Sequence, residues 1–350
     1  MGRKGLQVNS FAISLCLAAA AALGVYGQAT PAPKPPPKKP SVKVEAPALA
    51  EPPDLPDHEM KGRDISEKAL AVDANVNIKL PCVSQAKVII NGWNRNEIRV
   101  FIKNGSKIAL RVLEKDSVSG KPVWVLITSV AGETPRPLLS ECLSGDRIEI
   151  DVPVKASLEI TGRETETRID SVKRIKIKNL GGNVALRNIS GGITAATFEG
   201  DVAVENSGGQ ISLETSTGNI IAFEVSPGQI GDTFIAKTSK GAITLQKVDH
   251  RQIDANSVSG SVVFNGKFLP GGLYNFNTSN GSIKLAIPND SSCKIIASYG
   301  YGTFNYTIPL KILTQNVSQG GKSLVASMGA GDATVKVTTS SGSVGIGKQQ

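Results

Sequence analysis

Glycine recurs at a fixed spacing through the second half of the chain, and a branched aliphatic residue follows it two positions later. The step is nine residues up to residue 220 and then lengthens to 23, 19 and 21 residues. A repeat of about 20 residues is typical of a solenoid, in which each repeat packs only on its neighbours. The aligned aliphatic residues, expected to be buried, are Val184, Ile193, Val202, Ile211, Ile220, Ile243, Val262, Ile283 and Val344.

Each repeat has a turn, a glycine and then alternating hydrophobic residues, as in "EGDVAVENS" and "TGNIIAFEV". Alternation sends every second side chain to one face of a short strand. Two such strands with their turns make one coil, so the glycines are expected at corners that need unusual backbone angles. The sequence predicts an all-β protein, a single-stranded β-solenoid or parallel β-helix of about 18–23 residues per coil with an irregular N-terminal β region.

Composition changes along the chain predict four parts. Arg3 and Lys4 precede an uncharged apolar run, which is typical of a secretory signal peptide at residues 1–28; a membrane anchor would need a longer run. Residues 29–63 are rich in proline and lysine and are interpreted as a disordered tether. Residues 64–153 form an N-terminal β region or cap, and residues 154–350 form the solenoid. The protein is therefore expected to be exported to the periplasm, cell surface or extracellular space.

The N-terminal β region contains short runs of β-branched residues, such as "AKVII" and "NEIRVFI". The segment "NGWNRN" between these two runs has the chemistry of a hairpin loop. Trp93 and Trp124 are interpreted as cap or core residues rather than as a platform for sugars. The region is either a separate domain or the first coils, and its long strands favour a continuous structure with an irregular start.

Three cysteines remain after removal of a signal peptide, in an oxidising compartment. Cys82 and Cys142 flank the same β-rich region and are predicted to form a disulfide. Cys293 is then unpaired and is interpreted as a small buried hydrophobic residue. The scattered spacing predicts no metal site.

Basic residues give the chain a formal net charge of +9. The densest stretch, "VKRIKIK", places Arg174, Lys176 and Lys178 on one face of a strand. The simpler interpretation is a solvated strand face, and the alternative is attraction to anionic polysaccharide, lipid or nucleic acid. An export signal argues against nucleic acid. These three residues are the surface-binding candidates.

Repeats of this kind are compatible with two kinds of functional site, a calcium site and an enzyme active site. The calcium-binding nonapeptide needs glycine and aspartate where "GGQISLETS" has isoleucine and leucine, so calcium is not expected. Many parallel β-helices are polysaccharide lyases or hydrolases, and Asp249, His250, Arg251 and Asp254 form the densest cluster of suitable side chains. This cluster is interpreted as a polar loop between coils. No catalytic residue, cofactor or metal is predicted.

Three segments resemble a bacterial family labelled "putative adhesin", related to the head domains of autotransporter adhesins. They are "INGWNRNEIRV", the run of Thr/Ser-x-Gly-x-Ile/Val units from about residue 180 to 283, and "SIKLAIPNDSSCKIIASYGYGTF". Asn94 and the run from Tyr299 to Gly302 depart from the family pattern. The resemblance covers most of residues 70–347 and implies an exported, non-enzymatic β-solenoid without catalytic residues.

Two functional hypotheses follow. The first is an adhesin or envelope-associated structural protein that contacts a surface polymer, a polysaccharide or a surface protein through its sheet faces, with peripheral membrane association as a further option. The second is a polysaccharide-active lyase or hydrolase on a β-helix. The final coil, "TVKVTTSSGSVGIGKQQ", is expected to end the stack uncapped, which would allow end-to-end self-association.

Overall fold

The computed structural model describes residues 65–130, 142–319 and 321–349. The chain divides into two units, residues 1–58 and 59–350, and all described residues lie in the second. The expected signal peptide and tether lie outside the described residues. Within the described ranges the chain forms strands and no α-helix, and so no helix there could cross a membrane.

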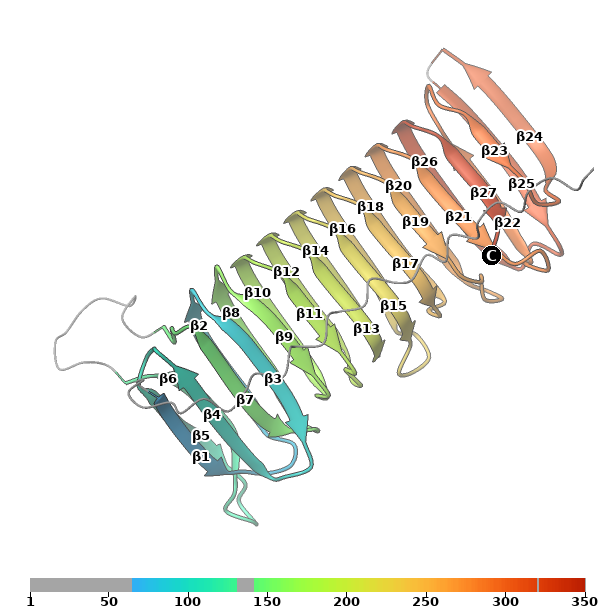
Figure 1. The fold of residues 1–350 in the computed structure, drawn as a ribbon. Helices are drawn as coiled ribbons and strands as arrows, with labels where there is room; N and C mark the ends of the chain where they lie inside the picture. The colour runs from blue at the N-terminus through green and yellow to red at the C-terminus, as the bar shows by residue number, and fades with distance from the viewer. Residues whose placement is uncertain (1–64, 131–141, 320, 350) are drawn as a thin grey trace, which may run out of the picture. The chain divides into compact units, whose positions relative to one another are not determined.

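Strands of the second unit form two sheets, and through the repeats the chain alternates between them (Figure 1). The first sheet has 13 strands in the order β1 (Ile65–Ala71), β4 (Glu97–Lys103), β7 (Arg147–Pro153), β3 (Lys87–Trp93), β9 (Glu166–Asp170), β11 (Val184–Arg187), β13 (Val202–Gly208), β15 (Ile220–Ser226), β17 (Ile243–Val248), β19 (Val262–Asn265), β21 (Ile283–Ile287), β27 (Val344–Lys348) and β23 (Phe304–Tyr306). We call it sheet A.

Sheet B has 14 strands. Their order is β24 (Lys311–Ser318), β25 (Gly321–Met328), β22 (Cys293–Ser298), β26 (Ala333–Ser341), β20 (Leu273–Asn280), β18 (Gln252–Ser259), β16 (Thr233–Lys240), β14 (Ile211–Thr217), β12 (Ile193–Glu199), β10 (Arg174–Gly181), β8 (Ser157–Arg163), β2 (Asn77–Ser84), β6 (Pro122–Ser129) and β5 (Ile108–Lys115).

The parallel register confirms the predicted solenoid and its period. In sheet A, Val184 lies opposite Val202, which lies opposite Ile220, and the pairing continues through Ile243 and Val262. The steps are the 18–23 residues read from the sequence. All nine aligned aliphatic residues are buried. Alternation along each strand therefore builds a continuous aliphatic core between the two sheets.

Glycine is required where the chain passes from sheet B to sheet A, because the corners stack with almost no space. A Cβ on Gly218 would lie 2.1 Å from the carbonyl oxygen of Gly200, and one on Gly241 would lie 1.9 Å from that of Gly218. The hydroxyls that precede these glycines close the same corner. Thr238 Oγ1 donates to the Gly218 carbonyl at 3.0 Å, and Ser257 Oγ donates to the Gly241 carbonyl at 2.8 Å. The glycine rhythm therefore turns the chain.

At the N-terminal end, the strands join the same two sheets but leave the repeat pattern. β2 pairs with β8 and β3 pairs with β9, so sheets A and B run on into this region. The expected hairpin at "NGWNRN" is wrong, because β7 lies between β3 and β4. β7 runs parallel to β3 and antiparallel to β4, so the turn reverses the chain without pairing the two strands it connects.

The cysteines and tryptophans of this region have distinct environments. Cys82 and Cys142 form a disulfide, with their Cα atoms 4.5 Å apart. Trp93 is partly buried and donates its indole N–H to the Glu97 carbonyl at 2.8 Å. Trp124 is 40% exposed on β6, near the N-terminal end of sheet B, so it is not a core residue.

The C-terminal end also departs from chain order. The final coil, β26 and β27, lies between the coil of β20 and β21 and the strands β22 and β23 (Figure 1). The expectation that this coil ends the stack uncapped is therefore wrong. It is an interior coil with neighbours on both sides, and the outer strands at this end are β24 and β23. Residues 299–302 depart from the family pattern but still form the corner of their coil, because Gly302 stacks on Gly342.

Candidate functional site

The three basic candidates lie on the outward face of β10, as alternation predicts. Arg174, Lys176 and Lys178 are exposed, while the residues between them are buried. Lys176 Nζ lies 3.4 Å from a carboxylate oxygen of Glu159 on β8, and Arg174 Nε donates to the Gly191 carbonyl at 3.1 Å. Two of the three cations thus have partners within the protein, and all three remain accessible to solvent.

The cluster at residues 249–254 does not form a common site. Arg251 donates to the Pro270 carbonyl, and Asp254 accepts a hydrogen bond of 3.0 Å from the Asn275 amide on the outward face of sheet B. His250 instead points into the core and is fully buried. The side chains that are close in sequence therefore point in different directions.

His250 has the geometry of a structural residue. Its Nε2 lies 2.8 Å from the Gly209 carbonyl, its ring lies 5.8 Å from that of Phe234, and its Nδ1 is buried without a hydrogen-bond partner. Burial lowers the pKa of His250, since the charged form loses its hydration; the Gly209 carbonyl opposes this shift. A neutral imidazole fills this corner of the core.

A second corner, where the chain passes from sheet A to sheet B, carries a feature that the sequence analysis missed. Five successive coils each place one non-glycine residue in the left-handed region of φ. Only a few per cent of non-glycine residues adopt this conformation, and asparagine adopts it most readily. The five residues, which we call the polar column, are Ser171 (φ 58°), Asn188 (54°), Asn206 (45°), Glu224 (53°) and Lys247 (52°).

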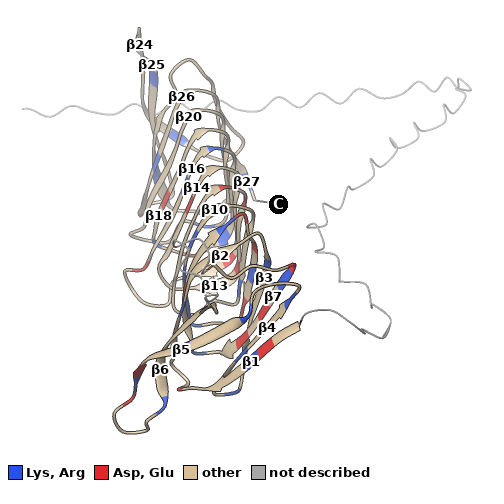
Figure 2. Ribbon diagram, turned by 90° about the vertical axis from the view of Figure 1, so that its left-hand side faces the viewer, with Lys and Arg blue, Asp and Glu red and all other residues tan. Residues whose placement is uncertain are grey.

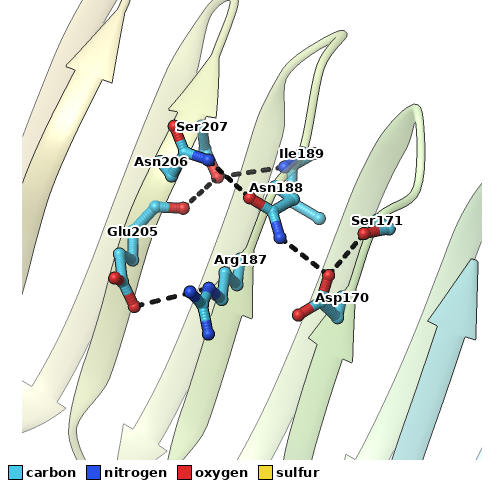
Figure 3. A network of polar contacts seen from close by, with 8 residues as sticks. All are labelled: Asp170, Ser171, Arg187, Asn188, Ile189, Glu205, Asn206 and Ser207. Atoms are coloured by element: carbon cyan, nitrogen blue, oxygen red, sulfur yellow. Dashed lines mark hydrogen bonds and ion pairs between the residues drawn. The ribbon is translucent and has the colours of Figure 1, made fainter.

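Side chains of the polar column bond from coil to coil (Figure 3). Asn206 Nδ2 donates to Asn188 Oδ1 at 2.6 Å, and Asn188 Nδ2 donates to Asp170 Oδ1 at 2.9 Å. Further along, Lys247 Nζ lies 2.7 Å from Glu224 Oε1. The amide dipoles of the two asparagines therefore point the same way, toward the Asp170 carboxylate.

Beside the polar column the surface is hollowed. The hollow has a volume of about 300 Å³, and serines, asparagines and one glutamate supply most of its wall. Ser207, on the wall, accepts a hydrogen bond of 3.1 Å from the Ile189 amide (Figure 3). Its lining residues are Asn188, Ile189, Ser190, Asn206, Ser207, Gly208, Glu224 and Ser226. Such a wall offers donors and acceptors to hydroxyl groups.

Charges of both signs are interspersed along the ribbon (Figure 2). Next to the polar column, Arg187 Nε lies 3.8 Å from Glu205 Oε2 (Figure 3). Within the described part of the chain, no group of three or more histidine, cysteine, aspartate or glutamate side chains is arranged to hold a metal ion. The hollow therefore offers mixed polar contacts rather than a single strong charge.

The match to a family model agrees with the fold and names no chemistry. The family model Toastrack DUF4097 matches residues 232–347, which reach from just before β16 into β27. A crystal structure of a "putative cell adhesion protein" from Clostridium sporogenes is 11% identical, covers 82% of this chain and 100% of that chain, and has a TM-score of 0.26. No curated protein matches the chain.

The signal for the polar column is present in the sequence once the coils are aligned. Asn188 and Asn206 each stand four residues after an aligned valine, at Val184 and Val202. Asparagine at a fixed place in successive coils suggests a ladder of side chains at a left-handed corner. The repeated glycines mark the opposite corners, so their spacing does not reveal this one.

Proposed function

We propose that this protein is an exported, non-enzymatic adhesin of the bacterial envelope that binds a hydroxyl-rich polymer along the polar column. The observation that carries the proposal is the register of Asn188, Asn206 and Glu224 beside a polar hollow. Groups repeated at the spacing of coils, about 4.8 Å, suit a ligand that is itself long and repetitive. Binding of this kind needs many weak hydrogen bonds and no reaction chemistry.

Residues 249–254 are the best candidate active site in the sequence, but their side chains point in different directions. This arrangement argues against an enzyme. A glycosidase needs two carboxyl groups facing one bond, and a buried neutral His250 with its Nε2 on a backbone carbonyl is not placed to serve them. The envelope location follows from the predicted signal peptide and tether.

The test is a retention assay with insoluble polysaccharides and bacterial envelope fractions. The protein used spans Glu59 to Gln350, the unit that contains every described strand. Bound protein and newly released saccharide ends are both measured. The test variant is Asn188→Gly with Asn206→Gly, because glycine accepts positive φ and the change removes only the amides. Asn256→Ala, on the outward face of sheet B, is the matched control.

We expect retention on at least one polymer, with no release of saccharide ends. The double glycine variant should bind at least about tenfold more weakly, since each lost hydrogen bond contributes about 1 kcal/mol. Equal retention of this variant and the wild type would refute the polar column as the site. Release of saccharide ends that stops in Asp249→Ala or Asp254→Ala would instead establish an enzyme.

A further inference from the structure

The outward face of β10 continues its row of cations into an exposed apolar pair. Leu180, on the same face as Lys178, is 59% exposed, and Phe198 on the neighbouring strand β12 is 58% exposed. The residues on either side are paired, Asn179 with Thr197 and Gly181 with Glu199, so Leu180 and Phe198 are neighbours. Large apolar side chains exposed together beside a charged row mark an interaction site more often than isolated ones do.

Positive charge predominates on the β2, β8 and β10 side of this pair. β2, β8 and β10 present Lys79, Arg163, Arg174, Lys176 and Lys178 to solvent or nearly so. The acidic residues nearby are Glu159, which already faces Lys79 and Lys176, the exposed Glu164 beside Gly181, the exposed Glu199 that follows Phe198, and the exposed Glu214, two strands from Lys178 in the same row. We call Arg174, Lys176, Lys178, Leu180 and Phe198 the basic–apolar patch.

We propose that the basic–apolar patch docks the solenoid on an anionic lipid bilayer. Lysine and arginine are attracted to anionic headgroups, while a leucine and a phenylalanine gain free energy at the boundary between headgroups and acyl chains. A purely anionic polymer would interact with the cations alone, and contact with Leu180 would not strengthen its binding. The combination of both side-chain types selects a surface that is negatively charged outside and apolar just beneath.

The patch is separate from the polar column. Leu180 and Phe198 lie at the ends of sheet B strands, next to the glycine corners, whereas Asn188 directly follows β11 and Asn206 lies near the end of β13, at the opposite corners. The lipid contact therefore goes beyond the proposed polymer binding and does not depend on it. Failure of either can be seen without failure of the other, because different variants test them.

Vesicle sedimentation tests the docking with the Glu59–Gln350 unit. The vesicles contain phosphatidylcholine alone or phosphatidylcholine with phosphatidylglycerol. One test variant removes charge, Arg174→Gln with Lys176→Gln and Lys178→Gln, and the other removes apolar area, Leu180→Ser with Phe198→Ser. Matched controls on sheet B strands away from the patch are Lys237→Gln with Lys294→Gln and Lys336→Gln, and Val258→Ser with Leu273→Ser, the last two residues being 50% and 56% exposed.

We expect binding to the phosphatidylglycerol vesicles that weakens as salt is added. Each removed cation should lower the partition coefficient about fivefold, and the apolar variant should lower it even at low salt. The controls should bind like the wild type. All substitutions are at exposed positions, and the stability of each variant is checked by thermal unfolding. If a combined variant is unstable, a single substitution replaces it: Lys178→Gln for the charge variant and Phe198→Ser for the apolar variant.

Three results would overturn the proposal. The first is no binding of the wild type to the anionic vesicles. The second is equal weakening by the controls, which would indicate an effect of overall charge. The third is that Leu180→Ser with Phe198→Ser binds vesicles like the wild type while an anionic polysaccharide, polygalacturonate, is retained through the cations. That outcome would assign the patch to a polymer.

Discussion

The middle of the solenoid and its two ends are built by different rules. From β8 to β21, each coil pairs in parallel with the coil before it, and glycine corners stack at the limit of contact. At the N-terminal end, β1, β4, β5 and β6 introduce antiparallel pairs, and at the C-terminal end β24 and β25 do the same. The middle is specified by local repetition, and the ends are specified by contacts between distant segments.

This difference has a physical reason. A parallel stack left open would present unpaired N–H and C=O groups at both ends, which invites pairing with other chains. Antiparallel hairpins and a final coil placed inside the stack limit that exposure. Among the edge strands β1, β5, β23 and β24, β24 is exposed over its whole length and pairs only with β25. Any end-to-end association would therefore use edge strands such as β24 rather than the final coil.

The largest effect is expected at the N-terminal end, where a disulfide replaces repetition. Cys82 and Cys142 close a loop with a sequence separation of 60. Replacing both by serine should lower the free energy of unfolding by about 4 kcal/mol in the chain-entropy model. The free energies of unfolding in urea should agree between the variant and the reduced wild type. A loss below about 1 kcal/mol would mean that the other contacts of this end suffice.

A glycine corner in the middle should come next. Gly241→Ala places a Cβ 1.9 Å from the Gly218 carbonyl oxygen at a φ of 151°, so we expect a loss of about 3 kcal/mol. Gly345→Ala is the matched control, because nothing lies within 4 Å of its Cβ. It should change stability by less than about 0.5 kcal/mol. Urea unfolding measures the loss of stability in each variant. Equal losses in the two variants would show that close stacking of the glycine corners does not explain the effect.

His250 adds a pH dependence to the middle coils. Its pKa is lowered in the folded state, chiefly by burial, so the unfolded chain binds the proton first. Its contribution is therefore complete above pH of about 6.5 and declines below it, by at most about 1.4 kcal/mol per pH unit. His250→Gln should unfold with a flatter dependence on acid. Parallel pH profiles for variant and wild type would contradict the assignment.

The smallest effect is expected in the polar column. Asn206→Ala removes the bond to Asn188 and keeps a residue at positive φ, which together should cost about 1–2 kcal/mol. Asn206→Gly removes the same bond but relieves the backbone, so it should cost less. Thermal unfolding ranks the two variants. The reverse order would show that backbone conformation does not limit this corner.

Local rules in the sequence predicted the middle of the fold almost completely. The residue two positions after each of the nine aligned glycines begins a strand and is buried, from Val184 to Val344. The same rules could not place the final coil. Val344 shows the same pattern as Ile283, and nothing in alternation records that β27 lies next to β21 while β23 lies outside it.

The site was predicted only in part for the same reason. The basic residues of β10 were found because one strand carries them. The polar column and the pair of Leu180 with Phe198 each combine residues from different coils, so they appear only when the coils are superimposed. Residue type alone could not decide between cap and core for Trp124, which the antiparallel β5 and β6 leave exposed.

The measurement that tests this account most directly is disulfide trapping at the C-terminal end. Asn277 lies opposite Thr338, and Thr338 lies opposite Ser298, all on the outward face of sheet B. In a Cys293→Ala background, cysteines at 277 and 338 should cross-link, being one strand spacing of about 4.8 Å apart. Cysteines at 277 and 298, two spacings apart, should not. Cross-linking of 277 with 298 instead would mean that the coils follow chain order, and would contradict the claim that the final coil is inserted.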